Sequence, residues 1–178
     1  MNTLNADIIA RVRNVKLAVL DVDGVMTDGS LNYGPDGETI KTFNSRDGHG
    51  MKMLQYSGVA IAIVSGRHSQ ALTRRAGDLG IGYLYPGVDD KGKVFAELLT
   101  RLGLQAAQVA SIGDDVVDLP ILTRCGFAVA VPAAPAFVQT RVHYVTTAAG
   151  GHGAVREFCD LIMQAQGTHD AALAKYLQ

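Results

Sequence analysis

Aspartates occur in two short groups of this sequence, and grouped carboxylates can bind metal ions and handle phosphoryl groups. Asp21 and Asp23 directly follow one apolar segment, and Asp114, Asp115 and Asp118 follow another. Carboxylates that meet at the ends of buried strands repel one another unless a cation is present. Oxygen ligands without Cys or His favour Mg²⁺, which binds a few carboxylates and completes its shell with water and phosphate. The two groups therefore predict a magnesium site at one edge of a sheet.

A structural explanation exists for each aspartate taken alone. An Asp after a strand is often a turn residue or the cap of the next helix. Asp115 and Asp118 keep this alternative, because they can cap a helix that begins near Val116. Two groups at equivalent strand ends, each beside a glycine, favour a shared site.

Two further segments can bind phosphate. Ser65 and Gly66 end an apolar segment and lead toward a helix, whose first amides can bind phosphoryl oxygens together with the Ser hydroxyl. The same dipeptide is also a common helix cap. Lys91, at the start of a later helix, can supply a fixed positive charge, although lysines there are usually solvated. Spacing alone does not decide between Lys91 and Lys93.

The elements that must position these residues alternate along the chain. Short apolar runs predict buried strands, and segments with helical spacing between them predict helices. This alternation predicts an α/β fold with a doubly wound, mainly parallel sheet, in which ligands bind beyond the carboxyl ends of the strands. The expected strands are 16–21, 59–64, 82–85, 108–112 and 128–131, and the expected helices are 5–15, 47–57, 68–79, 91–102, 115–124, 134–140 and 153–166.

Residues 30–43 break the alternation. Two short strands around the turn 34–37 predict a β-hairpin. Its apolar side chains would protrude from a monomer, so we expect an oligomer built around this hairpin, unless they pack on their own domain. These side chains are Leu31, Tyr33, Ile40 and Phe43.

Composition sets the general class of the protein. With 178 residues, 48% of them hydrophobic, the chain can bury a core without disulfides. We expect one domain over residues 1–178, with residues 168–178 as a mobile tail. The formal charge of −1 and the scattered basic residues argue against nucleic acid as a partner. Cys125 and Cys159 stand alone and are expected to be buried thiols in a reducing compartment.

The N-terminal segment carries charges among its apolar residues, unlike a signal peptide. The longest apolar runs are too short to span a bilayer. We therefore expect a cytoplasmic protein that does not bind a membrane.

The chain resembles the haloacid dehalogenase superfamily of phosphotransferases over about residues 16–150. Four motifs stand at strand ends in the family's order: Asp21-Val-Asp23-Gly-Val-Met-Thr-Asp28-Gly29, Ser65, Lys91 and Gly113-Asp-Asp-x-x-Asp118. The resemblance implies a Rossmann-like core in which Asp21 attacks phosphorus and forms an aspartyl phosphate. It implies that Asp23 protonates the leaving oxygen and later activates water.

The same resemblance implies a metal site and a phosphate site. Mg²⁺ would be held by the carboxylates of Asp21 and Asp114 and by the main-chain carbonyl of Asp23. Ser65 and Lys91 would bind the transferring phosphoryl group. Because this transition state spreads negative charge over its oxygens, a metal ion and a lysine can supply most of the catalysis.

Larger members of this superfamily carry a cap domain, for which the present chain has no room. A cap is inserted after the first motif or between the second and third, and residues 24–58 and 68–90 hold only short elements. A site without a cap is open to water, so selectivity needs walls from elsewhere. We expect a neighbouring subunit to supply them.

More narrowly, the sequence is similar along nearly its whole length to the capless 3-deoxy-D-manno-octulosonate 8-phosphate phosphatases. The resemblance implies hydrolysis of that sugar phosphate in lipopolysaccharide precursor synthesis. It implies a homotetramer with the hairpins at its centre and a C-terminal tail that can reach a neighbouring site. The segments that carry the resemblance are the first motif, the hairpin, Phe43–Gly50, Val64–Arg67, Gly113–Asp118 and Gly150–Glu157.

The family resemblance also implies a set of substrate contacts. An acidic sugar phosphate carries a carboxylate as well as a phosphate, and planar Arg46 or Arg67 suits the carboxylate. Each arginine singly is more often a surface residue. The implied substrate-binding residues are Asp23, Asn44, Ser45, Arg46, Asp47, Gly48, Lys52, Ser65, Gly66, Arg67, Arg75 and Lys91.

Three alternatives remain open from the sequence. A related capless phosphatase would act on a nonulosonate 9-phosphate, and only pocket residues distinguish it. A phosphoacceptor signalling domain would also use a strand-end Asp, an acidic group and a Lys, but Asp23 equips this site for turnover. A metal-binding scaffold without activity would bind Mg²⁺ and release no phosphate.

Overall fold

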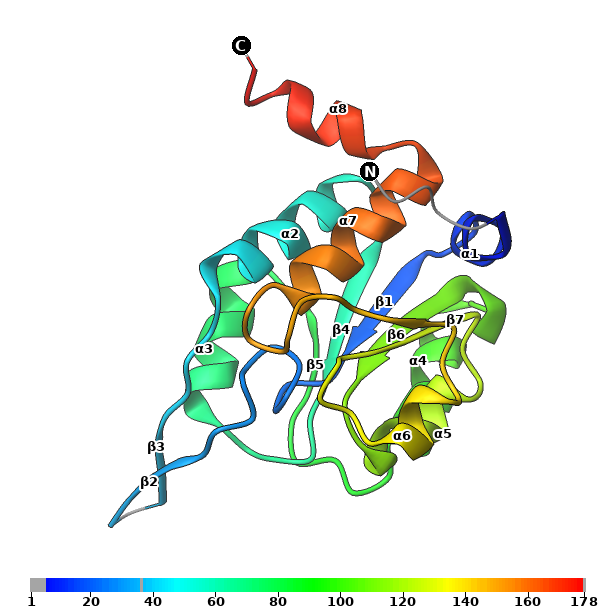
Figure 1. Cartoon of the computed structure of the whole chain (residues 1–178). Helices are drawn as coiled ribbons and strands as arrows, with labels where there is room; N and C mark the ends of the chain where they lie inside the picture. The colour runs from blue at the N-terminus through cyan, green and yellow to red at the C-terminus, as the bar shows by residue number, and fades with distance from the viewer. Residues whose placement is uncertain (1–5, 36, 178) are drawn as a thin grey trace.

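A six-stranded, wholly parallel sheet forms the centre of the protein, in the order β5-β4-β1-β6-β7-β8 (Figure 1). The computed structural model describes residues 6–35 and 37–177. The sheet confirms the predicted doubly wound fold, and β8 adds a strand of two residues that the sequence pattern did not indicate. The strands are β1 (Leu17–Leu20), β4 (Ala60–Val64), β5 (Tyr83–Tyr85), β6 (Val109–Gly113), β7 (Phe127–Ala130) and β8 (Tyr144–Val145).

Helices cover both faces of the sheet. On one face α2 packs side by side with α7, with α1 against α7 and α3 against α2; α4 and α5 pack together elsewhere (Figure 1). The predicted helix 115–124 is split into a 3₁₀ turn, η2, and the short α5. The helices are α1 (Ala6–Val12), α2 (Ser45–Tyr56), α3 (Gln70–Leu79), α4 (Lys91–Leu102), α5 (Leu119–Leu122), α6 (Ala136–Gln139), α7 (Ala154–Gln166) and α8 (His169–Ala174), with 3₁₀ turns η1 (Ala106–Gln108) and η2 (Val116–Asp118).

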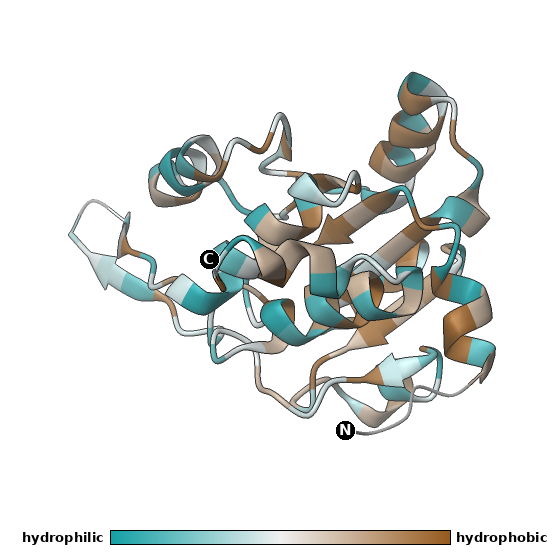
Figure 2. Cartoon of the chain, turned by 90° about the horizontal axis from the view of Figure 1, so that it is seen from above, coloured by the Kyte–Doolittle hydropathy of each residue, from teal (hydrophilic) through white to brown (hydrophobic). Residues whose placement is uncertain are grey.

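The core lies between the sheet and the helices, with hydrophobic residues concentrated along the strands and polar residues on the outer helix faces (Figure 2). Each residue of Leu17–Leu20 is at most 1% exposed. A strand buried on both faces reads as a continuous apolar run, because crossover helices cover both sides of a parallel sheet. Burial of each large side chain stabilises the fold by about 1.5–3 kcal/mol.

The strand order reverses beside β1. The chain goes from β1 to β4 and β5 on one side, and then returns to build β6, β7 and β8 on the other. Leu20 pairs with Ile63 of β4 and with Ile112 of β6, so these three strands end at one edge. Ligands of doubly wound sheets bind where the strand order reverses, beyond the carboxyl ends. The fold therefore brings the residues after β1, β4 and β6 together.

The hairpin of β2 (Asn32–Gly34) and β3 (Gly37–Ile40) stands away from the main sheet (Figure 1). Leu31, Tyr33 and Ile40 are 44%, 62% and 63% exposed, as expected for a protruding element. Phe43 is different: it is half-buried and packs against the core, below the Arg75 guanidinium. The expectation that Phe43 protrudes is therefore wrong.

The C-terminal segment forms α8 instead of a mobile tail. It follows Gly167, whose φ of 71° ends α7. The Tyr176 hydroxyl lies 2.7 Å from His49 Nε2, and Lys175 Nζ lies 4.1 Å from the centre of the Tyr56 ring. Residues 169–177 thus dock on α2 through polar and aromatic contacts. Of the predicted segments, residues 1–5, Asp36 and Gln178 lie outside the described residues.

The described part of the chain contains no helix long and apolar enough to cross a bilayer. Cys125 and Cys159 are free and buried, as expected from their isolation in the sequence. Burial raises the pKa of the Cys125 thiol to about 12, so this thiol stays protonated at neutral pH.

Candidate active site

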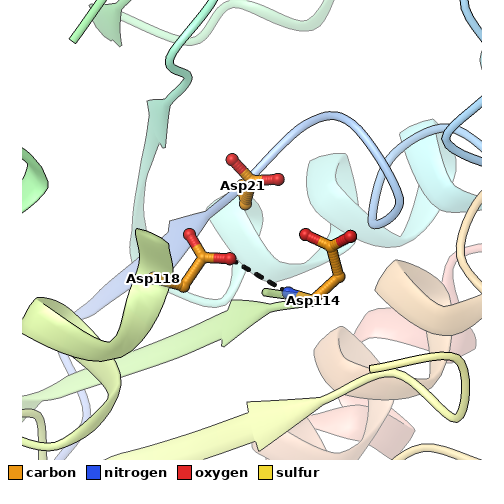
Figure 3. A group of neighbouring side chains, drawn as sticks. All are labelled: Asp21, Asp114 and Asp118. Carbon is orange, nitrogen blue, oxygen red and sulfur yellow. Dashed lines mark hydrogen bonds between the residues drawn. The ribbon is translucent and has the colours of Figure 1, made fainter. Parts of the chain in front are cut away.

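Three carboxylates from two strand ends converge beyond β1 and β6 (Figure 3). Asp21 follows β1, Asp114 follows β6, and Asp118 ends η2. One oxygen of each lies within 4.8 Å of the others. The structure therefore brings together the two groups of aspartates that the sequence indicated.

Lys91 is the cation of this cluster. Its Nζ donates to Asp21 Oδ1, and to Asp118 Oδ1 at 2.7 Å, and the residue is only 4% exposed. Burial works against the charged form, but the two carboxylates outweigh it and hold the pKa of Lys91 above its usual value. Lys93 is exposed, so the structure decides between the two lysines.

The start of α4 explains why Lys91 is buried. Asp90 caps the helix, and its Oδ1 accepts a hydrogen bond from the Lys93 amide at 3.0 Å. This cap makes Lys91 the first helical residue, where its side chain turns into the strand edge. Lys93, two residues further along the helix, faces solvent.

The carboxylates carry more negative charge than Lys91 balances. Burial, followed by repulsion from Asp118, raises the pKa of Asp21 to about 7. Burial, followed by Asp118 and Asp115, likewise raises the pKa of Asp114 to about 7. An oxygen-only cluster with surplus negative charge is suited to a divalent cation. The residues present therefore fit the Mg²⁺ that the sequence predicts.

Asp118 holds the turn after β6 in place. Its Oδ2 accepts a hydrogen bond from the amide of Asp114 at 3.0 Å (Figure 3). The same oxygen accepts from the amide of Asp115 at 3.2 Å, while Oδ1 accepts from Lys91. A Cβ on Gly113 would lie 2.6 Å from Asp118, so a glycine is needed there. Asp115 is exposed and accepts from the Val116 amide at 2.7 Å. The sequence left these roles open; Asp115 is a cap, and Asp118 positions both Lys91 and the turn.

The loop after Asp21 is tied together by one buried hydroxyl. Thr27 Oγ1 accepts hydrogen bonds from the amides of Gly24 at 3.3 Å and Gly29 at 3.2 Å, and donates to the Val22 carbonyl at 3.4 Å. Gly24 has φ 82°, and a Cβ there would lie 2.2 Å from Asp114 Oδ2. The loop can approach Asp114 only because this position is glycine.

A second glycine loop packs on the first one. A Cβ on Gly150 would lie 1.7 Å from the Gly24 carbonyl oxygen. The Gly151 amide donates to the Val25 carbonyl at 2.9 Å, and its own carbonyl accepts from Asn44 Nδ2 at 3.1 Å. The loop before α7 therefore supports the loop that follows Asp21.

Asp23 lies at the rim of the site and contacts the hairpin. Its Oδ1 accepts a hydrogen bond from Lys41 Nζ, and its Oδ2 lies 3.8 Å from Arg67 Nε. Lys41 is not predicted from the sequence, because a lysine beside a hairpin strand is ordinarily a solvated residue. No local signal distinguishes it from such a lysine.

Ser65 is buried at the end of β4, but it does not begin a helix. Its Oγ accepts a hydrogen bond from the Arg67 amide at 3.2 Å, while Gly66 is exposed. α3 starts at Gln70, where Ser69 is the cap and accepts from the Leu72 amide at 3.3 Å. The prediction of helix-start amides at Ser65 and Gly66 is therefore wrong. What remains there is a tight turn with a buried hydroxyl.

The predicted substrate loop forms the start of α2. Asn44 caps the helix by accepting hydrogen bonds from the amides of Arg46 at 2.8 Å and Asp47 at 3.3 Å. Ser45 and Arg46 are exposed, and Arg46 lines a pocket of about 500 Å³ together with His152 and other residues of α7 and the loop before it. The Arg46 side chain thus faces a hollow that contains none of the clustered carboxylates.

Asp47, Gly48 and Arg75 make contacts that hold the fold together. Asp47 Oδ1 accepts from the Arg156 amide at 2.8 Å, which caps the first turn of α7, and burial raises the pKa of Asp47. Arg75 Nη2 donates to the Asn44 carbonyl at 3.2 Å. A Cβ on Gly48 would lie 2.1 Å from that nitrogen. These residues join α2 to α3 and α7.

Lys52 is not brought to the carboxylates within one chain. It lines a pocket of about 350 Å³ with residues 77–80, at the C-terminal end of α3. Because α3 runs antiparallel to the strands, that end lies toward their amino edge, opposite Asp21. A contact of Lys52 with substrate at the carboxylate cluster stays a prediction that the single chain does not support.

Comparisons with known proteins identify the family of this chain. A family model described as haloacid dehalogenase-like hydrolase matches residues 83–158. The 3-deoxy-D-manno-octulosonate 8-phosphate phosphatase of Escherichia coli K12 is 43% identical over 95% of this chain and 90% of its own length. That of Yersinia pestis is 46% identical over 93% of this chain and 89% of its own length.

Solved structures of this kind superpose closely. The Yersinia pestis enzyme has a TM-score of 0.91, covering 94% of this chain and 90% of its own at 46% identity. The Moraxella catarrhalis enzyme, in complex with magnesium, phosphate and the sugar acid, has a TM-score of 0.93 at 39% identity, covering 96% of this chain and 98% of its own. The chain therefore belongs to the haloacid dehalogenase superfamily and, within it, to the 3-deoxy-D-manno-octulosonate 8-phosphate phosphatase family.

Proposed function

We propose that this chain hydrolyses 3-deoxy-D-manno-octulosonate 8-phosphate to the free sugar acid and phosphate, with Mg²⁺ as cofactor. The observation that carries the proposal is the position of the buried Asp21. It accepts a hydrogen bond from Lys91, one of its oxygens lies within 4.8 Å of an oxygen of Asp114, and Asp23 follows two residues later. A nucleophile, a cation and a proton-transfer group are thereby present at one strand edge. The names and identities of the relatives support the choice of substrate.

The geometry supports a two-step reaction. An oxygen of Asp21 attacks phosphorus, the bond from phosphorus to the sugar oxygen breaks, and Asp23 gives its proton to that oxygen. Asp23 then takes a proton from a water molecule, which attacks phosphorus, releases phosphate and restores Asp21. Lys91 holds Asp21 in place and balances charge on the phosphoryl oxygens.

The metal would be held by the carboxylates of Asp21 and Asp114 and by the main-chain carbonyl of Asp23. When bound, Mg²⁺ supplies positive charge to the phosphoryl oxygens and to the crowded carboxylates. Asp118 is occupied by Lys91 and by two amides, so it supports the site and leaves ligation to the other two.

Further residues are proposed to contact the substrate. Ser65, Gly66 and Lys91 would bind the phosphoryl group, and Arg46 or Arg67 the carboxylate, which planar guanidinium groups bind well. The residues Asn44, Ser45, Asp47, Gly48 and Arg75 would shape the wall next to α2. Lys52 would contact the substrate only at a surface shared between subunits, because its pocket lies toward the opposite edge of the sheet.

The chain is proposed to act as one phosphatase domain in a cytoplasmic homotetramer that supplies lipopolysaccharide precursors. The exposed apolar side chains of the hairpin support an assembly around it, since Leu31, Tyr33 and Ile40 are 44%, 62% and 63% exposed in the single chain. Analytical ultracentrifugation that finds only monomers at working concentrations would exclude a site shared between subunits.

The test compares phosphate release from the eight-carbon ester and from a nonulosonate 9-phosphate, side by side with Mg²⁺. We expect many turnovers on the eight-carbon ester, none with Asp21→Asn, and full activity with the control Asp7→Asn, which changes an exposed residue of α1 outside the site. A preference for the nine-carbon ester would overturn the substrate. A single phosphorylation without turnover would indicate a signalling domain, and no reaction with either ester a scaffold.

A further inference from the structure

A closed ring of four charged side chains joins the hairpin to the rim of the site. Lys41 Nζ contacts Asp23 Oδ1 and lies 3.4 Å from Glu38 Oε1. Arg67 Nη2 donates to Glu38 Oε2 at 3.2 Å, and Arg67 Nε lies 3.8 Å from Asp23 Oδ2. Two acids and two bases alternate around the ring, so their formal charges cancel.

The two bases of this ring differ in burial. The Lys41 side chain is 3% exposed, whereas that of Arg67 is 36% exposed. A buried ammonium group is costly unless carboxylates surround it, and Lys41 has two of them. Its Nζ is enclosed by Asp23 and Glu38, so Lys41 has no free path to a substrate. Any effect of Lys41 on the reaction must therefore pass through Asp23, its hydrogen-bond partner, or through Glu38 and the Arg67 that Glu38 holds.

The two oxygens of Asp23 also differ. Oδ1 accepts the hydrogen bond from Lys41, whereas Oδ2 accepts none from the described residues and faces Arg67 at 3.8 Å. A carboxylate tied at one oxygen loses rotational freedom and presents the other oxygen in a fixed direction. Lys41 directly follows β3, so the base of the hairpin sets that direction.

We propose that Lys41 is a positioning residue that holds Asp23 through Oδ1, so that Oδ2 is the oxygen that exchanges protons during the reaction. The proposal rests on the proposed phosphatase function. In the first step Oδ2 gives a proton to the sugar oxygen as the phosphorus–oxygen bond breaks. It then accepts a proton from the water that attacks the aspartyl phosphate.

The test uses two phosphate esters that differ in their need for a proton. The alkoxide of the sugar must be protonated as it leaves, whereas p-nitrophenolate leaves without a proton. Since general acid catalysis contributes about 10²–10⁴-fold, we expect Lys41→Met to lower kcat/KM about tenfold or more for 3-deoxy-D-manno-octulosonate 8-phosphate. The loss for p-nitrophenyl phosphate should be about threefold or less, and KM should change little.

The matched control is Lys93→Met, which removes an exposed lysine outside the site and should leave both rates unchanged. Added to Asp23→Asn, Lys41→Met should lower the remaining rate on the sugar phosphate by less than about twofold, because residues that act as one unit are not additive. Equal losses on both esters would overturn the proposal. So would a raised KM at unchanged kcat, which would make Lys41 a substrate contact.

Should Lys41→Met fail to fold, Lys41→Arg replaces it. The planar guanidinium keeps the charge but cannot place a single donor at the same point, so the selective loss on the sugar ester should persist. Wild-type rates on both esters would overturn the proposal. If the wild-type chain shows no Mg²⁺-dependent activity on the sugar phosphate, the proposed function itself fails; if that activity is intact, equal losses overturn only the role of Lys41.

Discussion

The carboxylate cluster and the hairpin rim serve the same site but are built differently. Asp21 and Lys91 are 8% and 4% exposed, and they stand on the ends of a buried strand and of a capped helix. Asp23 is 24% exposed at its side chain, and its partners come from a hairpin outside the sheet. Rigid elements hold the groups proposed to bind metal and phosphorus, whereas an outlying element holds the group proposed to move protons. Substitutions in the first region should lower the reaction rate and the stability. Substitutions in the second should alter the selectivity between esters and the rates of individual steps.

The largest expected effect is at Asp21. Asp21→Asn keeps the shape of the side chain but removes the attacking oxygen, so phosphate release should fall more than about 10³-fold. Steady-state phosphate release measures this loss, and circular dichroism checks that the fold is intact. Substantial remaining turnover would show that another group attacks phosphorus.

Asp118 is expected to affect both catalysis and stability. Asp118→Ala leaves Lys91 with Asp21 alone and strips two part-buried amides of their acceptor, so the free energy of unfolding should fall by about 2–4 kcal/mol. Activity should fall at least about tenfold because Lys91 loses its position. Urea unfolding gives the first value. In the same assays Asp115→Ala, which removes only an exposed cap, should lose about 1 kcal/mol or less.

The cluster should also make stability depend on pH and metal. The folded pKa values of Asp21 and Asp114 lie near 7, above the usual 3.8, so the folded chain binds more protons than the unfolded chain between about pH 4 and 7. Stability of the metal-free protein should therefore fall as the pH rises through this window. Excess Mg²⁺ needs the ionised carboxylates and should stabilise more at pH 8 than at pH 5.5.

Thermal unfolding with EDTA or Mg²⁺ at both pH values measures this linkage. A difference of about 1 kcal/mol corresponds to ~2–4 °C in Tm for a chain of this size. The same experiment on Asp114→Asn should show a weaker response to both pH and Mg²⁺. An equal Mg²⁺ effect at the two pH values would contradict the assignment of these carboxylates to the metal.

The smallest change is expected for a substitution at Tyr33 in the hairpin. Tyr33→Phe removes the hydroxyl that Arg67 contacts but leaves the ring over which the guanidinium lies. Because this pair is exposed, kcat on the sugar phosphate should stay within about twofold and stability within ~0.5 kcal/mol. A loss of activity or stability comparable with that of Asp118→Ala would contradict the difference between the rigid carboxylate cluster and the outlying hairpin.

The alternation of elements and the position of the acids follow from local patterns in the sequence. Continuous apolar runs predict buried strands because strands covered on both faces need no polar side, and Asp21 and Asp114 directly follow such runs. Parallel strands end at one edge, so the meeting of these acids followed from local pattern and topology rules. The helix 91–102 was predicted with its observed bounds because its cap and its final glycine are local signals.

The partners of those acids, in contrast, depend on how distant segments pack together. Lys91 and Asp21 are 70 positions apart, and Lys41 and Asp23 are 18 apart, so no local pattern records either pair. For the same reason α8, which docks through His49 and Tyr56, could not be told from a polar tail. Local periodicity reports what each segment buries, whereas the identity of a charge partner depends on where distant segments are placed by the packing of the whole core.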